Sequence, residues 1–185
     1  CRYIDGLQAH AYSWVGTSRG RTGFAPESRL SSFGELNEWF RLARVMFKVG
    51  NGANDGHLPV YVSEFGWDGA GGGATCVGHG PECVSERAQA VYAVRGALLC
   101  ARLGAYRASW FFFADLGSDK SGVFARSGLT TSVETGSVPK QSYRAMAGLV
   151  RVLGSSHFLG AVQEDDQLGW VHTYVGFGVA LTLLA

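Results

Sequence analysis

Titratable and aromatic side chains follow short apolar segments at three places in this 185-residue sequence. In chain order they are His10, Tyr12, Trp14, Glu64, Trp67, Trp110 and Asp115. Carboxyl, imidazole and phenol groups serve nucleophilic and acid–base chemistry, and aromatic side chains line the apolar walls of ligand pockets. Glu64 lies between Val62 and Phe65, so its carboxylate is costly to bury unless it accepts a hydrogen bond.

Each of these side chains also has a structural interpretation. Glu64 could pair with a loop arginine, and His10 and Tyr12 could be satisfied residues of the core. The tryptophans could fill the core, and Asp115 could cap a loop. The residues alone leave these alternatives open.

The segments around these side chains alternate between short apolar strands and amphipathic helices, which predicts βα units around a parallel sheet. The expected strands are residues 6–14, 60–65 and 106–113. Apolar residues at helical spacing predict helices at about 32–47, 86–103 and 140–153. Ser32 with Glu35 forms a capping box for the first helix, Ser85 caps the second, and Gly104 ends it.

Long polar or glycine-rich segments are expected as loops at 16–29, 66–84 and after 113. Long loops in compact domains are usually functional. In βα barrels the carboxyl ends of the strands line the active site, which would gather the side chains above around one opening.

The pattern of apolar residues changes after about residue 155. The helical spacing is lost there, and short segments typical of β-strands follow. We therefore expect residues 1–155 to form one unit and residues 156–185 to begin a β-sandwich. Three βα units cannot close a (β/α)8 barrel, which needs eight units in roughly 250 residues. The prediction is the last three units of a TIM barrel, cut at both ends, in an α/β chain; a small doubly wound domain is the alternative.

A consequence of this prediction concerns the first strand, Gly6 to Trp14. It would need the missing N-terminal barrel half, or another protein, beside it. Expressed alone, residues 1–185 are expected not to fold as an independent unit.

Four cysteines allow limited cross-linking. Cys76 and Cys83 share a glycine-rich loop and are candidates for a disulfide, whereas Cys100 falls in an apolar helix and is expected to be a buried thiol. Cys76, His79 and Cys83 also offer three soft ligands, but a structural zinc site usually has four. No metal or cofactor is expected.

The net charge is +1, and no stripe of Lys and Arg suggests nucleic acid as a partner. The glycines at 69–73 are not followed by the residues of a nucleotide-binding loop. No apolar run reaches the ~20 residues of a membrane span. A small or neutral ligand is expected.

Four segments resemble those of the clan A retaining glycoside hydrolases. VYVSEFGWDG, residues 60–69, resembles the nucleophile motif of the seventh barrel strand, and AHAYSW, residues 9–14, resembles the sixth strand. ASWFFFAD, residues 108–115, resembles the eighth strand, and PKQSYRAM, residues 139–146, resembles the start of the last helix. The resemblance covers about residues 1–155.

This resemblance implies roles for individual residues. Glu64 would be the nucleophile, Tyr12 would donate a hydrogen bond to it, and His10 would contact the sugar. Trp110 would floor a sugar subsite, and the further candidate substrate-binding residues are Trp67 and Asp115. The clan's acid/base Glu belongs to the fourth strand, which this chain does not contain.

The implied function is retaining hydrolysis of a glycosidic bond in an oligo- or polysaccharide by a secreted enzyme. The alternative is a catalytically inactive relative that binds carbohydrate or serves as a structural component of an extracellular assembly. A third possibility is a self-contained small α/β domain with an unrelated role.

Overall fold

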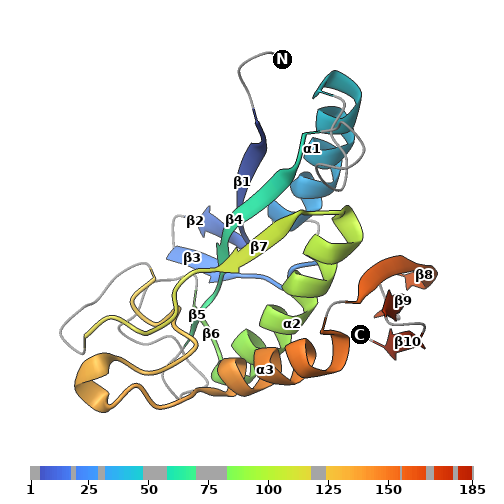
Figure 1. Ribbon diagram of the computed structural model, residues 1–185. Helices are drawn as coiled ribbons and strands as arrows, with labels where there is room; N and C mark the ends of the chain where they lie inside the picture. The colour runs from blue at the N-terminus through green and yellow to red at the C-terminus, as the bar shows by residue number, and fades with distance from the viewer. Residues whose placement is uncertain are drawn as a thin grey trace.

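The structure is a computed structural model that describes residues 5–17, 20–28, 32–47, 58–69, 83–117, 124–154, 156–165, 169–176 and 179–184. Its centre is a parallel sheet in the order β1–β4–β7, formed by β1 (Leu7–Tyr12), β4 (Val60–Gly66) and β7 (Arg107–Trp110) (Figure 1). In the chain, α1 (Ser32–Phe47) lies between the first two strands and α2 (Glu86–Leu103) between the second and third. The predicted βα alternation is confirmed for these elements.

Local signals set the ends of α2 as expected. The Ser85 hydroxyl accepts a hydrogen bond from the Ala88 amide at 3.1 Å, and Gly104 ends the helix with a left-handed φ of 77°. A residue without a Cβ adopts this conformation without steric cost. The third helix, α3 (Gln141–Leu153), also has the predicted extent, and Gly154 follows it.

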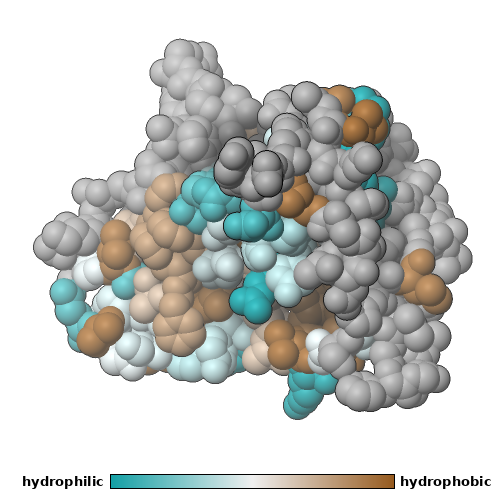
Figure 2. Space-filling model, turned by 45° about the horizontal axis from the view of Figure 1, so that its top comes forward, coloured by the Kyte–Doolittle hydropathy of each residue, from teal (hydrophilic) through white to brown (hydrophobic). Residues whose placement is uncertain are grey.

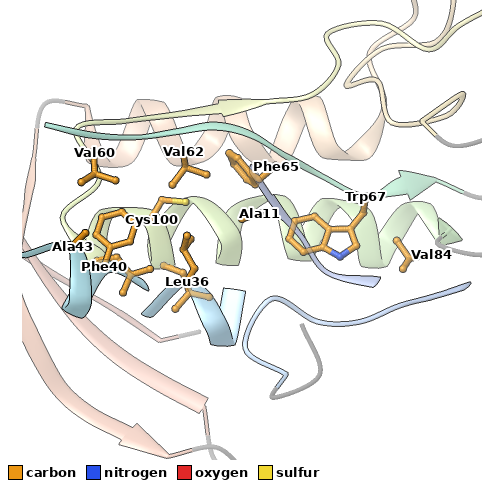
Figure 3. Packing of buried hydrophobic residues seen from close by; sticks show 12 residues of the cluster. Ala11, Leu36, Phe40, Ala43, Val60, Val62, Phe65, Trp67, Val84 and Cys100 are labelled. Atoms are coloured by element: carbon orange, nitrogen blue, oxygen red, sulfur yellow. The ribbon is translucent and has the colours of Figure 1, made fainter. Parts of the chain in front are cut away.

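One apolar core joins both helices to one face of the sheet (Figure 3). The buried side chains are Leu36, Phe40 and Ala43 of α1, Val60, Val62 and Phe65 of β4, and Leu99, Cys100 and Leu103 of α2. Because all of them belong to one cluster, α1 and α2 cover the same face. Cys100 is a free thiol and is 1% exposed, which confirms the predicted buried thiol, and burial raises its pKa to about 12.

The strand β4 contains one more residue than either neighbour between matching positions. Ala9 and His10 of β1 pair with Val62 and Glu64, and Ala108 and Trp110 of β7 pair with Val62 and Phe65. Such a bulge shifts the alternation of side chains between the two faces. Val62 and Phe65, three residues apart, therefore both point into the core, and both are at most 1% exposed.

Two strand predictions need correction. Residues 16–29, predicted as a loop, include most of an antiparallel hairpin of β2 (Trp14–Thr17) and β3 (Gly20–Gly23). The segment is polar and so lacks the apolar alternation that predicts a strand. A hairpin can nevertheless form, because its two strands pair through backbone hydrogen bonds. β7 is shorter than the predicted 106–113, because the later backbone pairs elsewhere: the Phe113 carbonyl accepts hydrogen bonds from the amides of Leu129 and Thr130.

A buried ion pair fixes the segment that follows β7. The Lys140 ammonium lies 3.0 Å from Asp115 Oδ1, and the two side chains are each 4% exposed. Asp115 Oδ1 also accepts a hydrogen bond from the Gly128 amide at 2.8 Å. Lys140 further donates to the Arg126 carbonyl at 2.9 Å. These bonds hold residues 115, 126 and 128 at the start of α3.

The Arg126 carbonyl is a meeting point for three elements. Besides Lys140, it accepts hydrogen bonds from the Gly69 amide at 2.9 Å and from Gln89 Nε2 of α2 at 3.1 Å. Gln89 is fully buried and accepts a hydrogen bond from Ser142 of α3 at 3.1 Å. The network joins α2, α3 and the short parallel pair of β5 (Asp68–Gly69) and β6 (Cys83–Val84).

The C-terminal part of the chain is a separate antiparallel sheet in the order β10–β9–β8. Its strands are β8 (His157–Asp165), β9 (Gly169–Gly176) and β10 (Val179–Leu184), and the short 3-10 helix η1 (Val133–Thr135) precedes α3. The prediction of β structure after residue 155 is thus confirmed. In the part of the chain that the structure describes, no helix has the length and apolarity to cross a membrane.

The buried ion pair leads to a stability prediction. Replacing Lys140 by Met leaves the Asp115 carboxylate buried without its ammonium partner, so the free energy of unfolding of the protein should fall by about 3–5 kcal/mol. Urea denaturation measures this. The control is Arg41→Met, which breaks the exposed Glu38–Arg41 pair and should hardly change the melting temperature. If the two variants were equally stable, the Asp115–Lys140 pair would not be needed to hold this part of the fold together.

Candidate active site

Glu64 and Tyr12 meet at the carboxyl ends of neighbouring parallel strands. The Tyr12 hydroxyl donates a hydrogen bond of 2.7 Å to Glu64 Oε2. The pKa of Tyr12 lies well above its usual range, first because the phenol is partly buried and then because of the hydrogen bond and charge of Glu64. The phenol therefore stays protonated and remains a hydrogen-bond donor to the carboxylate.

His10 is the third member of this group. Its Nδ1 lies 3.5 Å from Glu64 Oε2, and the side chains of His10 and Glu64 are 45% and 30% exposed. The alternation along β1 explains the grouping: Ala11 is buried in the core, so His10 and Tyr12 point to the opposite face. The bulge in β4 places Glu64 on that same face. The structure thus brings together three of the predicted site residues.

Two further aromatic residues adjoin this group. The ring of Phe124 lies 4.8 Å from that of Tyr12, and the ring of Phe111 lies 6.4 Å from it. Neither residue was predicted from the sequence to have a role. The aromatic run after β7 was a signal for Phe111, but Phe124 belongs to a loop with no motif.

Trp67 departs from the predicted substrate-binding role. It is 3% exposed, and its indole N–H donates to the Phe24 carbonyl at 2.8 Å. Its ring and that of Phe65 pack over Gly96 of α2, where an added Cβ would lie 3.2 Å from either side chain. The side chain belongs to the core and presents no open ring face.

Trp110 is placed differently from the predicted subsite floor. Its ring lies 5.4 Å from that of Phe65 and 6.0 Å from that of Trp67, and its indole N–H donates to the Ser127 carbonyl at 2.8 Å. Because Trp110 pairs in register with Phe65, the two side chains turn to the same face, the one that the helices cover. The next residue, Phe111, points toward Tyr12 instead.

The remaining predicted residues do not join Glu64. Asp115, expected to bind substrate, is 7% exposed and engaged by Lys140, so this expectation is corrected to a structural role. Trp14 begins the hairpin strand β2, and its side chain lies outside the described residues. The proposed disulfide and the alternative metal site also lie there, since both need Cys76, so the disulfide stays a prediction.

The surface of the molecule combines polar and apolar parts. Figure 2 shows hydrophilic and apolar areas side by side on one face of the molecule, and Phe113 and Leu116, which follow β7, are 67% and 39% exposed. A partly exposed carboxylate with a phenol and an imidazole beside it can hydrogen-bond a polyhydroxylated ligand, and it can also attack an electrophilic carbon.

Comparison with solved structures finds this fold in glycoside hydrolases. A family 39 glycoside hydrolase from the gut symbiont Bacteroides cellulosilyticus WH2 matches 77% of this chain with a TM-score of 0.53 and 22% identity. A monomeric β-xylosidase from Caulobacter crescentus CB15 matches 92% with a TM-score of 0.48 and 16% identity. The chain spans only 26% and 31% of their lengths. No protein-family model and no curated protein sequence matches it. The resemblance to glycoside hydrolases is confirmed at the level of the fold.

Proposed function

We propose that this chain is part of a retaining glycoside hydrolase in which Glu64 is the nucleophile. The observation that carries the proposal is the 2.7 Å hydrogen bond from Tyr12 to Glu64, made where two parallel strands end and with His10 beside it. A hydrogen-bonded and partly exposed carboxylate at the carboxyl ends of sheet strands is poised for chemistry, because ligands of α/β proteins bind at this edge.

The arrangement of the sheet supports a barrel origin. The strand order follows the chain order, β1–β4–β7, and one core joins both connecting helices to the same face. A doubly wound sheet instead reverses its order and carries helices on both faces. We propose that these strands are the last three of a (β/α)8 barrel, with residues 1–155 as its C-terminal part and residues 156–185 as the start of a β-sandwich.

The proposed reaction begins with attack of the Glu64 carboxylate on the anomeric carbon of a glycoside. The bond to the leaving oxygen breaks as that oxygen takes a proton from a second carboxyl group, and water then hydrolyses the glycosyl ester. The Tyr12 hydroxyl donates a hydrogen bond to Glu64 Oε2 and so helps to hold the carboxylate in position for attack. The His10 ring is half-exposed and available for a hydrogen bond to a sugar hydroxyl.

The second carboxyl group is proposed to come from another part of the full-length protein. Retention requires it about 5–5.5 Å from the nucleophile. Three partly or fully buried acids of the described chain have other partners: Glu27 pairs with Arg95, Asp68 accepts from the Arg126 amide, and Asp115 pairs with Lys140. The first contact links a loop to α2, the second links β5 to the loop at Arg126, and the third links the segment after β7 to the start of α3.

The first test removes the nucleophile. In the full-length protein, Glu64→Gln should lower kcat on activated aryl glycosides by roughly four orders of magnitude or more, since the neutral amide cannot form the glycosyl ester. Thermal unfolding should change little, because the side chain is partly exposed. Glu38→Gln, on the exposed face of α1, is the matched control and should keep normal turnover.

Trapping the intermediate identifies the residue directly. A 2-deoxy-2-fluoro glycosyl fluoride should add one sugar to the peptide that contains Glu64, as detected by mass spectrometry. Labelling of another carboxylate would reject the assignment. Binding of oligosaccharide without turnover or labelling would favour the inactive carbohydrate-binding alternative.

The second test concerns the hydrogen bond. Tyr12→Phe should lower kcat about 10- to 100-fold, the worth of a hydrogen bond to a charged group. Tyr106→Phe, just before β7 and so at the opposite end of the sheet, is the matched control and should keep normal turnover. An unchanged kcat in Tyr12→Phe would argue against this role.

A further inference from the structure

The aromatic rings of Tyr12, Phe111 and Phe124 all lie against one another. The Tyr12 ring centroid lies 4.8 Å from that of Phe124 and 6.4 Å from that of Phe111, and the last two rings are 5.3 Å apart. Phe111 meets both other rings nearly at right angles, at 82° and 87°. Edge-to-face contacts at such distances are favourable and directional, so two rings restrict the tilt of the third.

The backbone holds Phe111 in place from the side of β4. Its amide donates to the Phe65 carbonyl at 2.9 Å. Gly66 passes so close that an added Cβ would lie 2.5 Å from the Phe111 carbonyl oxygen. Phe111 is therefore fixed to β4, the strand that carries Glu64. Its contacts there are with the two residues that follow Glu64.

Phe124 is held by the loop after β7 in an unusual conformation. Its φ is 71°, a left-handed value that is rare for a bulky residue. The surrounding turn retains it: the Ser127 amide donates to the Phe124 carbonyl at 3.2 Å, and the Leu116 amide donates to the Ala125 carbonyl at 3.0 Å. The Ser127 carbonyl in turn accepts from Trp110. Residues kept in such conformations cluster at functional sites.

We propose that Phe111 and Phe124 are positioning residues that act on Glu64 through Tyr12. The inference rests on the function proposed above. A catalytic constellation must hold its geometry to within about 0.5 Å, which requires rotamers locked by packing. Here two rings from the β7 side of the sheet restrain the phenol of β1, so its hydroxyl stays on the carboxylate of β4.

The test is a double-mutant cycle in the full-length protein. Phe124→Leu should lower kcat about three- to tenfold with little change in KM. In the Tyr12→Phe background the same change should have no further effect, because its target is already absent. Phe124→Tyr keeps a ring and should retain activity to within about twofold. Phe113→Leu, at a 67% exposed position, is the control. Equal losses in both backgrounds would overturn the proposal, since Phe124 would then act independently of Tyr12.

A spectroscopic measurement keeps the inference testable without turnover. In protein labelled with ¹³C at tyrosine Cζ, the Tyr12 resonance is assigned by its loss in Tyr12→Phe. Phe124→Leu or Phe111→Leu should shift it in the same direction as Glu64→Gln, and an unchanged resonance in both folded variants would refute positioning. Full turnover in Glu64→Gln would reject the proposed function instead, and the resonance would still report on the aromatic group.

Discussion

The extra residue in β4 determines which side chains face the helices and which face the open side of the sheet. Val62 and Phe65 both enter the core despite their odd spacing, and Glu64 emerges between them opposite His10. With regular alternation, Val62 and Glu64 would share a face, and the carboxylate would enter the apolar core, where its ionised form is strongly disfavoured. The Glu64 carboxylate lies on the open face of the sheet because the bulge breaks the regular alternation of side chains along β4.

Packing and chemistry are thus joined within a few residues of one strand. Phe65 anchors β4 on α2, and its carbonyl holds the Phe111 amide. Phe111 in turn lies against Tyr12, whose hydroxyl reaches Glu64. A displacement of the core aromatic residues would therefore be transmitted to the hydrogen bond of the site through a short chain of contacts.

Sequence patterns predicted the elements that local interactions specify. Ser85 and Gly104 bound α2 because caps act within one helical turn, and neighbouring parallel strands explain why Glu64, Tyr12 and His10 meet. The facing of Trp67 and Trp110 was not predictable, since it depends on a bulge that leaves no mark in composition. The Asp115–Lys140 pair joins residues 25 positions apart, and no local pattern announces a buried ion pair of this kind.

Gly66 limits how this sequence can change during evolution. Any other residue at this position would introduce a carbon 2.5 Å from the Phe111 carbonyl oxygen, inside the range of atomic repulsion. Point mutation at this codon can therefore succeed only together with a shift of the segment after β7, which carries its own contacts to Tyr12. Divergent descendants of this chain should vary in their loops while this glycine persists, which makes it a marker for recognising distant relatives whose remaining sequence has drifted.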